Sequence, residues 1–240
     1  MKKIEETKNQ IVFSVEAEDS LVNAVRRYIH QIPMLAVDDV EISRNDSPLY
    51  DETVAHRIGL IPLKIEKAVN DKSEGKLSLD VKRDGIVYSG DLKGNMKVVY
   101  ENIPITTLAK GQELKLVANV RPGTGTTHSK FAPGLMFYRH ATELTLDKNL
   151  YDEIRQICPD NEIKEKGDKI IVFDNLKKEV TDVCESISHK AKKKIESKAT
   201  GEVIVTLESF GQIASSDILK KSLDVLKKDL NDFVKAVDKA

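Results

Sequence analysis

The chain has 240 residues, 40% of them hydrophobic and 32% charged, which suits one large domain or two small ones around a modest core. Its formal net charge of −1 excludes a protein that holds nucleic acid by global charge alone, because neutralizing phosphates requires clustered Lys and Arg. The N-terminus lacks the apolar stretch of a signal peptide, and no apolar run approaches the ~18 residues of a membrane span. Two cysteines make no disulfide framework, so the sequence predicts a cytoplasmic protein without membrane contact.

The N-terminal segment predicts a strand, a helix and a second strand. Apolar and polar residues alternate over residues 11–15, which indicates the first strand. Apolar residues then recur at helical spacing over residues 21–32, and the helix ends before Pro33, which disfavors a helical conformation at its predecessor. Val37–Ile42 is the second predicted strand. The turn cluster Ser43–Pro48 follows and is a candidate domain boundary.

The stretch "TVAHRIGLIPL" (Thr53–Leu63) carries a polar pair between apolar flanks. It predicts a short helix over Asp51–Ile58 that ends at Gly59 in the left-handed conformation. From spacing alone, the pair His56 and Arg57 serves equally well as a structural salt bridge or hydrogen-bond donor and as a contact for a partner. Catalysis is the less favored interpretation.

The middle of the chain is predicted to be mostly β, because short apolar runs alternate with glycine turns. The predicted strands are Leu77–Val81, Ile86–Tyr88, Met96–Tyr100 and Leu114–Val120. A long loop rich in Gly, Pro and Thr follows over Arg121–Gly134. It is no phosphate cradle, since Gly123 and Gly125 lack a third glycine and Lys130 follows Ser129 rather than Gly. We expect a surface loop, with partner contact as the second choice.

Beyond this loop the pattern changes to a small α+β unit. The predicted elements are a strand at Thr142–Leu146, a helix at 150–157, a strand at Lys169–Phe173 and a helix at 176–187. Cys184 and His189 are five residues apart and do not share a helical face, and a zinc site or an iron–sulfur cluster requires four ligands. The sequence therefore predicts that Cys184 is a small buried hydrophobe.

The C-terminal segment has the most regular pattern. A last strand over Val203–Leu207 precedes a helix that Ser215 or Ser216 can cap. Its apolar residues follow alternating steps of 4 and 3, as in a heptad seam: Leu219, Leu223, Leu226, Leu230, Phe233 and Val237. Leaving six such side chains exposed would forfeit on the order of 10 kcal/mol. Ordinary core packing is one explanation of the seam, and a partner helix pair is the other.

Catalytic patterns are not recognizable in the sequence. No serine–histidine–acid set stands out, and no paired carboxylates occur in a recognizable frame. The charge runs near the C-terminus are typical of a solvated face.

Four stretches together resemble one protein family, the D-type subunits of archaeal RNA polymerase. They are "LVNAVRRYIHQIPMLAVDDVEI", "LYDETVAHRIGLIPLKI", "THSKFAPG" and "ESFGQIASSDILKKSLDVL". The family is related to the third-largest subunit of eukaryotic polymerase II and to the N-terminal domain of the bacterial alpha subunit. The resemblance covers nearly the whole chain, in the order the family has.

The resemblance implies an α+β fold in three parts. A discontinuous dimerization domain, a sheet plus two long helices, would comprise residues 1–45 and 200–240. A mostly β domain (46–145) is inserted in it, together with a small ferredoxin-like α+β insert (146–199). The family further implies a non-catalytic assembly platform of a nucleotidyltransferase. Such a subunit pairs with small subunit L through the seam and recruits the second-largest catalytic subunit, with small subunits N and P nearby and no direct nucleic-acid readout.

The resemblance also implies which residues meet partners. Contacts to large and small subunits would come from Arg26, Arg27, His56, Arg57, His128 and Lys130. Many family members carry cysteines for iron–sulfur clusters in the insert; here Cys158 and Cys184 are vestigial positions, so we expect no cofactor and no metal. Two alternatives stay open, a stand-alone redox or metal-binding protein and a homodimeric alpha-like scaffold.

Overall fold

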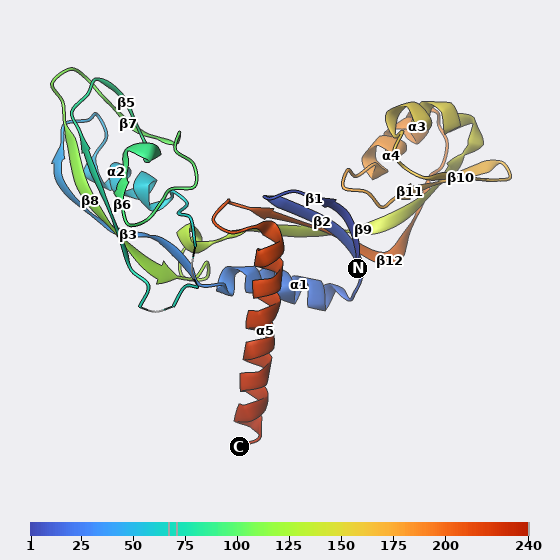
Figure 1. The fold of residues 1–240 in the computed structure, drawn as a ribbon. Coiled ribbons are helices and arrows are strands. Elements are labelled where there is room, and N and C mark those ends of the chain that lie inside the picture. The colour runs from blue at the N-terminus through green and yellow to red at the C-terminus, as the bar shows by residue number, and fades with distance from the viewer. Residues whose placement is uncertain (67, 71, 240) are drawn as a thin grey trace. The chain divides into compact units, whose positions relative to one another are not determined.

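The computed structural model describes residues 1–66, 68–70 and 72–239. The chain forms two compact units, and each unit combines segments that are far apart in the sequence (Figure 1). Unit 1 consists of Met1–Asn23 and Met136–Leu207, and unit 2 consists of Ala24–Leu135 and Glu208–Ala240. The mixed α+β class predicted from the sequence is confirmed.

Unit 1 is built on a six-stranded sheet in the order β1-β2-β12-β9-β11-β10. Its strands are β1 (Lys2–Glu6), β2 (Gln10–Glu16), β9 (Gly134–Asp147), β10 (Ile163–Lys166), β11 (Lys169–Asp174) and β12 (Glu196–Ser209). The pairs β1–β2, β9–β11 and β10–β11 are antiparallel. Gly167, with φ of +61°, allows the tight turn between β10 and β11.

One end of this sheet carries a small module with its own core, which we call the α3/α4 module. After β9 come η4 (Lys148–Leu150), α3 (Tyr151–Ile157), β10, β11, α4 (Thr181–Lys190) and β12. The order β-α-β-β-α-β is that of ferredoxin-like units. Its core is formed by Leu144, Leu146, Leu150, Ile154, Cys158, Ile170, Val172, Val180, Cys184 and Ile187.

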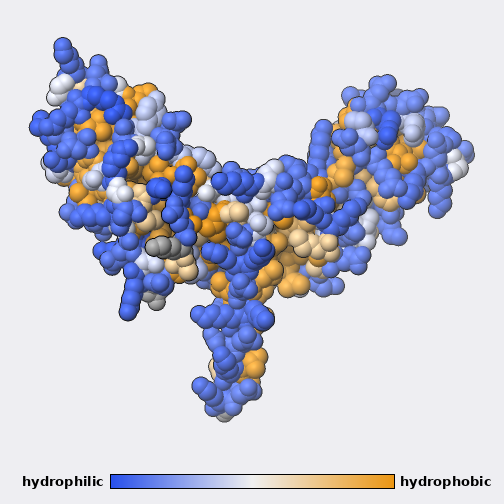
Figure 2. All heavy atoms as spheres, in the orientation of Figure 1, coloured by the Kyte–Doolittle hydropathy of each residue, from blue (hydrophilic) through white to orange (hydrophobic). Residues whose placement is uncertain are grey.

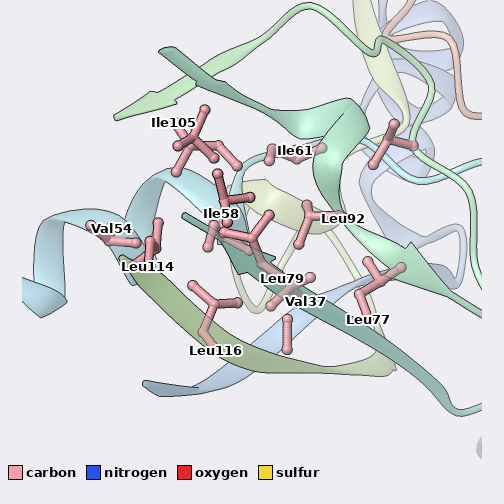
Figure 3. Close-up of a cluster of buried hydrophobic side chains, with 14 of the residues drawn as sticks. Val37, Val54, Ile58, Ile61, Leu77, Leu79, Leu92, Ile105, Leu114 and Leu116 are labelled. Atoms are coloured by element: carbon pink, nitrogen blue, oxygen red, sulfur yellow. The ribbon is translucent and has the colours of Figure 1, made fainter. Parts of the chain in front are cut away.

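Unit 2 contains a four-stranded sheet in the order β3-β8-β4-β6 and a two-stranded sheet, β5-β7. The strands are β3 (Met34–Asn45), β4 (Gly75–Val81), β5 (Gly85–Tyr88), β6 (Lys93–Gly94), β7 (Pro104–Leu108) and β8 (Leu114–Gly123). The short helices α2 (Asp51–Gly59) and η2 (Ser89–Asp91) lie between these strands, and η3 (Ser129–Phe131) follows β8. Side chains from both sheets and from α2 meet in one core, including Val54, Ile58, Leu79 and Leu116 (Figure 3).

Two further helices lie before and after the strands of unit 2 in the sequence. Helix α1 (Asp19–Tyr28) continues into η1 (Ile29–Gln31), and α5 spans Ser215–Val237. A hydrogen bond joins the Tyr28 hydroxyl to the Asp229 carboxylate and raises the pKa of Tyr28. This bond fixes the end of α1 to α5.

Several local predictions differ from the structure. Met96–Tyr100 forms no strand; Val98 makes only an isolated bridge to Leu63, since Pro62 has no amide hydrogen to extend the pairing. Gly59 is helical, without the expected positive φ. The residue before the first turn of α5 is Ala214, so neither candidate serine caps that helix. The second helix of the α3/α4 module begins at Thr181, five residues later than predicted.

Candidate interaction surfaces

Helix α2 presents the polar pair of the "TVAHRIGLIPL" motif outward. Val54 and Ile58 are fully buried in the core of unit 2, and helical spacing therefore turns His56 and Arg57 to the surface, where both are exposed. The two differ in their contacts. Arg57 Nη2 donates a hydrogen bond of 2.6 Å to the carbonyl oxygen of Pro104, which begins β7. Arg57 is thus held by the chain's own backbone.

The 3-10 helix η3 positions two more residues that the sequence singled out. His128 precedes η3, and its Nδ1 accepts a hydrogen bond of 3.1 Å from the backbone amide of Lys130. Lys130 Nζ donates to Asp38 Oδ1 at 2.9 Å and lies 5.1 Å from the centroid of the Phe131 ring. The Lys130 side chain is only 13% exposed, so it serves as a fixed charge and not as a mobile surface lysine.

Asp38, on the neighboring strand β3, provides the negative charge that pairs with Lys130. Its pKa is lowered, chiefly by the hydrogen bond from Lys130 and, to a lesser extent, by the charges of Arg121 and His128. Arg121 also approaches Asp38, with 3.7 Å between Nη1 and Oδ2. The carboxylate is therefore ionized at neutral pH, and it holds the Lys130 amino group in place.

The structure brings three predicted residues together around one hollow. His56, His128 and Lys130 line a depression of about 200 Å³ between α2 and η3. A second hollow of about 390 Å³ adjoins it and shares Leu60 and Lys130 as walls. We call the two hollows the α2–η3 surface. Its second half is lined by Pro62, Tyr100, Ser129, Ala132, Ser209, Phe210 and Gln212.

The second half of the α2–η3 surface is largely apolar. The side chains of Leu60, Tyr100 and Phe210 are all exposed there. Gln212 is buried, and no donor in the described part of the chain reaches its Oε1 atom. A buried amide oxygen without a donor costs free energy. The exposed apolar side chains of this half suit a partner more than bulk water.

Helix α5 carries a second apolar surface, the seam predicted from the heptad pattern. Leu223, Leu230, Phe233 and Val237 are 45%, 56%, 68% and 57% exposed. Leu219 and Leu226 are half-buried. Figure 2 shows apolar atoms among polar ones along the lower part of α5. Each such side chain would stabilize a complex by roughly 1.5–3 kcal/mol on full burial, which makes the seam unfavorable in water.

The remaining predicted contact residues lie on α1. Arg27 is exposed, whereas Arg26 is half-buried and makes an interaction of its own within the chain. Neither lines a hollow of the α2–η3 surface. The sequence missed Tyr100, Phe210, Gln212 and Val234, which is 55% exposed beside the seam. Of these four residues, only Val234 could have been found from the sequence, because it lies next to the heptad position Phe233.

The two cysteines lie inside the α3/α4 module, where they contact each other. Both thiols are buried and free, and they share a hydrogen bond. Burial raises the pKa of both thiols, that of Cys184 to about 12. In residues 1–66, 68–70 and 72–239, no group of three or more His, Cys, Asp or Glu side chains is placed to hold a metal ion. Two protonated thiols in an apolar core do not fit an iron–sulfur cluster, whose irons are held by thiolates.

Comparison with known proteins places the chain in a family. Residues 40–135 match the RNA polymerase Rpb3/RpoA insert domain. The DNA-directed RNA polymerase subunit Rpo3 of Thermococcus kodakarensis is 32% identical over 98% of this chain and 96% of its own length. The chain belongs to the archaeal Rpo3 family. The Rpo3 subunits of Archaeoglobus fulgidus and Methanosphaera stadtmanae are 30% and 29% identical, each over 98% of this chain.

The Rpo3 match extends over both units, whereas the insert-domain match falls within unit 2 and contains α2 and η3. The resemblance inferred from four short stretches is thereby confirmed, because the Rpo3 family comprises the D-type subunits of archaeal RNA polymerase. In the described portion of this Rpo3-family chain, no helix is long and apolar enough to cross a membrane.

Proposed function

We propose that this chain is a non-catalytic assembly platform within DNA-directed RNA polymerase. The observation that carries the proposal is the exposed seam on α5, because a helix of 23 residues with one uncovered apolar stripe requires a partner. The partner is small subunit L, whose helices pair with α5 and α1. The parts of the platform are the dimerization domain (1–45 and 200–240), the inserted β-rich domain (46–145) and a ferredoxin-like insert without cluster ligands (146–199).

The α2–η3 surface serves the next assembly step. Its half around His56, His128 and Lys130 presents polar groups, and its half around Leu60 and Phe210 presents apolar ones. Such a mixed patch is typical of contacts between subunits. We assign it, together with Arg27, to the second-largest catalytic subunit and small subunits N and P. Arg26 and Arg57 make contacts within the chain and act by positioning these elements.

The test is co-purification of the tagged full-length chain, with its partners identified by mass. Wild type should recover a small subunit in equal amount, and Leu230→Asp should lose it, because a charge in a dry helix interface is strongly unfavorable. Asn231→Asp is the matched control. It adds the same charge one residue away, outside the heptad seam, at an exposed position.

Two other outcomes of the co-purification would point to a different role for the chain. Recovery of a second copy of this chain alone identifies a homodimeric alpha-like scaffold. A soluble, monodisperse monomer for wild type and for Leu230→Asp contradicts the platform role.

A further inference from the structure

A cluster of lysines at the end of α4 lies outside every surface described so far. Lys190, Lys192, Lys193 and Lys194 are all exposed, and we call them the α4 lysine cap. This local excess of positive charge is not apparent from the chain's net charge of −1. Helix C-termini favor cations, but that effect fades beyond the last turn, and three of these lysines follow the final helical residue.

The backbone at Lys192 is the first unusual feature of the cap. Among the described residues, Lys192 is the only non-glycine with a positive φ, +55°. Its amide donates to the His189 carbonyl at 3.0 Å, and the Lys193 amide donates to the Ser188 carbonyl at 2.9 Å. These two bonds define a Schellman motif, in which glycine is the usual residue at this position. A lysine is less favorable than glycine in this conformation, so the charged side chain is present at a cost in stability.

A hollow beside the cap is the second feature. It measures about 580 Å³ and is lined by Ser188, His189, Lys190 and Lys193, along with Glu185, Ser186 and Ile195. Ser188 is 1% exposed, and its hydroxyl has no hydrogen-bond partner in the part of the chain that the structure describes. The hollow therefore combines cationic walls with a buried hydroxyl that lacks a partner.

Nearby acidic groups offset only part of this charge. Lys193 Nζ forms an ion pair of 2.9 Å with Asp147, and Glu185 lines the hollow. Glu196 is engaged by Lys169, a lysine outside the cap, at 3.0 Å. Lys190, Lys192 and Lys194 remain to face an external anion.

From these observations we propose that the α4 lysine cap binds the phosphodiester backbone of a duplex nucleic acid, independently of sequence. Residues 185–198 contain no Arg, Phe, Tyr or Trp. Lys binds phosphate as a point charge, without the fixed bidentate geometry of Arg, and this suits contact with a phosphodiester backbone independently of sequence. Binding of single strands relies on stacking of successive bases on aromatic side chains, and this segment has only the single imidazole of His189 for that. The inference does not depend on the platform role of α5.

The test measures binding of the full-length chain to a short labelled DNA duplex across salt concentrations. Replacing the four lysines of the cap with Ala should lower affinity at low salt by about tenfold or more, and should reduce the slope of log K against log salt by about 3, because three of the lysines are free to contact phosphates. The control variant replaces Lys220, Lys227, Lys228 and Lys235 with Ala. It removes the same charge from exposed positions of α5 and should bind like wild type.

Two substitutions at Lys192 distinguish the effect of its charge on duplex binding from the effect of its backbone conformation on stability. Lys192→Gly should weaken duplex binding and raise the thermal midpoint by about 2 °C, because glycine adopts positive φ freely. Lys192→Ala should weaken binding equally without the gain in stability. An RNA duplex that binds as well as the DNA duplex supports recognition of the backbone.

Three results would overturn the assignment: unchanged affinity in the fourfold cap variant, an equal loss in the α5 control, or tighter binding of poly-glutamate than of the duplex at matched charge and salt concentration. The last would show that the cap recognizes an acidic polypeptide.

Discussion

Helices α4 and α5 have the same kind of amphipathic sequence and opposite surroundings. On α4, Cys184 and Ile187 are buried against the sheet and α3, within a core that the chain completes by itself. On α5, Leu223, Leu230, Phe233 and Val237 are exposed, and Leu226 between them is only half-buried. Periodicity therefore predicts a helix and its apolar face, but not whether that face is covered within the chain or by a partner.

The α3/α4 module closes its core with a polar network as well. Asp174 is fully buried, and its carboxylate accepts hydrogen bonds from Arg139 Nη2 at 2.8 Å, the Val180 amide at 3.2 Å and the Thr181 hydroxyl at 2.8 Å. The network anchors the start of α4 to β9 and β11. Helix α5 has no comparable buried carboxylate among the described residues.

The sharpest test of the contrast makes one chemical change in both helices. Ile187→Asp places a charge in the module's core and should lower the free energy of unfolding by several kcal/mol. Leu230→Asp lies at an exposed site and should change the stability of the isolated chain by less than about 0.5 kcal/mol. Denaturant unfolding of the purified chains measures both. Equal losses would mean that α5 is covered by the chain itself.

Removing the buried carboxylate should produce the next largest effect. Asp174→Ala removes the charged partner of Arg139 and the acceptor of the Val180 amide, which precedes α4, and breaking such a pair costs about 3 kcal/mol. Hydrogen exchange should show faster opening across α3, α4 and β11. Asp182→Ala, at an exposed position in the first turn of α4, is the control. If Asp182→Ala loses as much stability, the effect comes from the change in net charge and not from the buried network.

The buried thiols predict a dependence of stability on alkaline pH. An unfolded thiol releases its proton near pH 8.5, while Cys184 holds its proton until about pH 12. Between these values the unfolded state binds fewer protons, so stability falls as pH rises, by about 1.4 kcal/mol per unit from this group. Unfolding curves of wild type and Cys184→Ala should diverge in slope over this range. Parallel curves would contradict the assignment.

The smallest expected effect concerns α1. Arg27→Ala removes an exposed guanidinium and should weaken recruitment of the second-largest subunit by up to about fivefold, most clearly at low salt. Reconstitution from separate subunits, scored by gel filtration, measures it. Arg26→Ala serves as the comparison, because its half-buried side chain should affect stability more than recruitment. If Arg27→Ala recruits the second-largest subunit as well as wild type at every salt concentration, Arg27 is only a solvated surface residue.

The sequence predicted the strongly periodic parts of the fold and missed those that depend on tertiary contacts. The alternation in β2 and the heptads of α5 are local signals, and both elements are present. The strand β10, "IKEK", has little apolar content and exists because β11 pairs with it. Met96–Tyr100 has apolar residues but lacks a partner strand along its length.

The same limit applies to the candidate sites. The sequence singled out His56, His128 and Lys130, yet only folding shows that they share a hollow, since β8 and η3 return the chain to α2. Tyr100 and Phe210 join them from segments more than a hundred residues apart, which no local pattern reveals. The role of Asp38 likewise depends on a contact with Lys130 that spans 92 residues.

The strand order of unit 1 has a consequence for how the protein is made. Strand β2 lies beside β12, and roughly 180 residues separate Glu16, where β2 ends, from Glu196, where β12 begins. At about 5–20 residues per second, a ribosome takes about 10–40 s to synthesize that interval. During this time one edge of β2 has no neighbor, and an unpaired strand edge can join other chains. Translation speed and chaperone supply should therefore influence the yield of native protein.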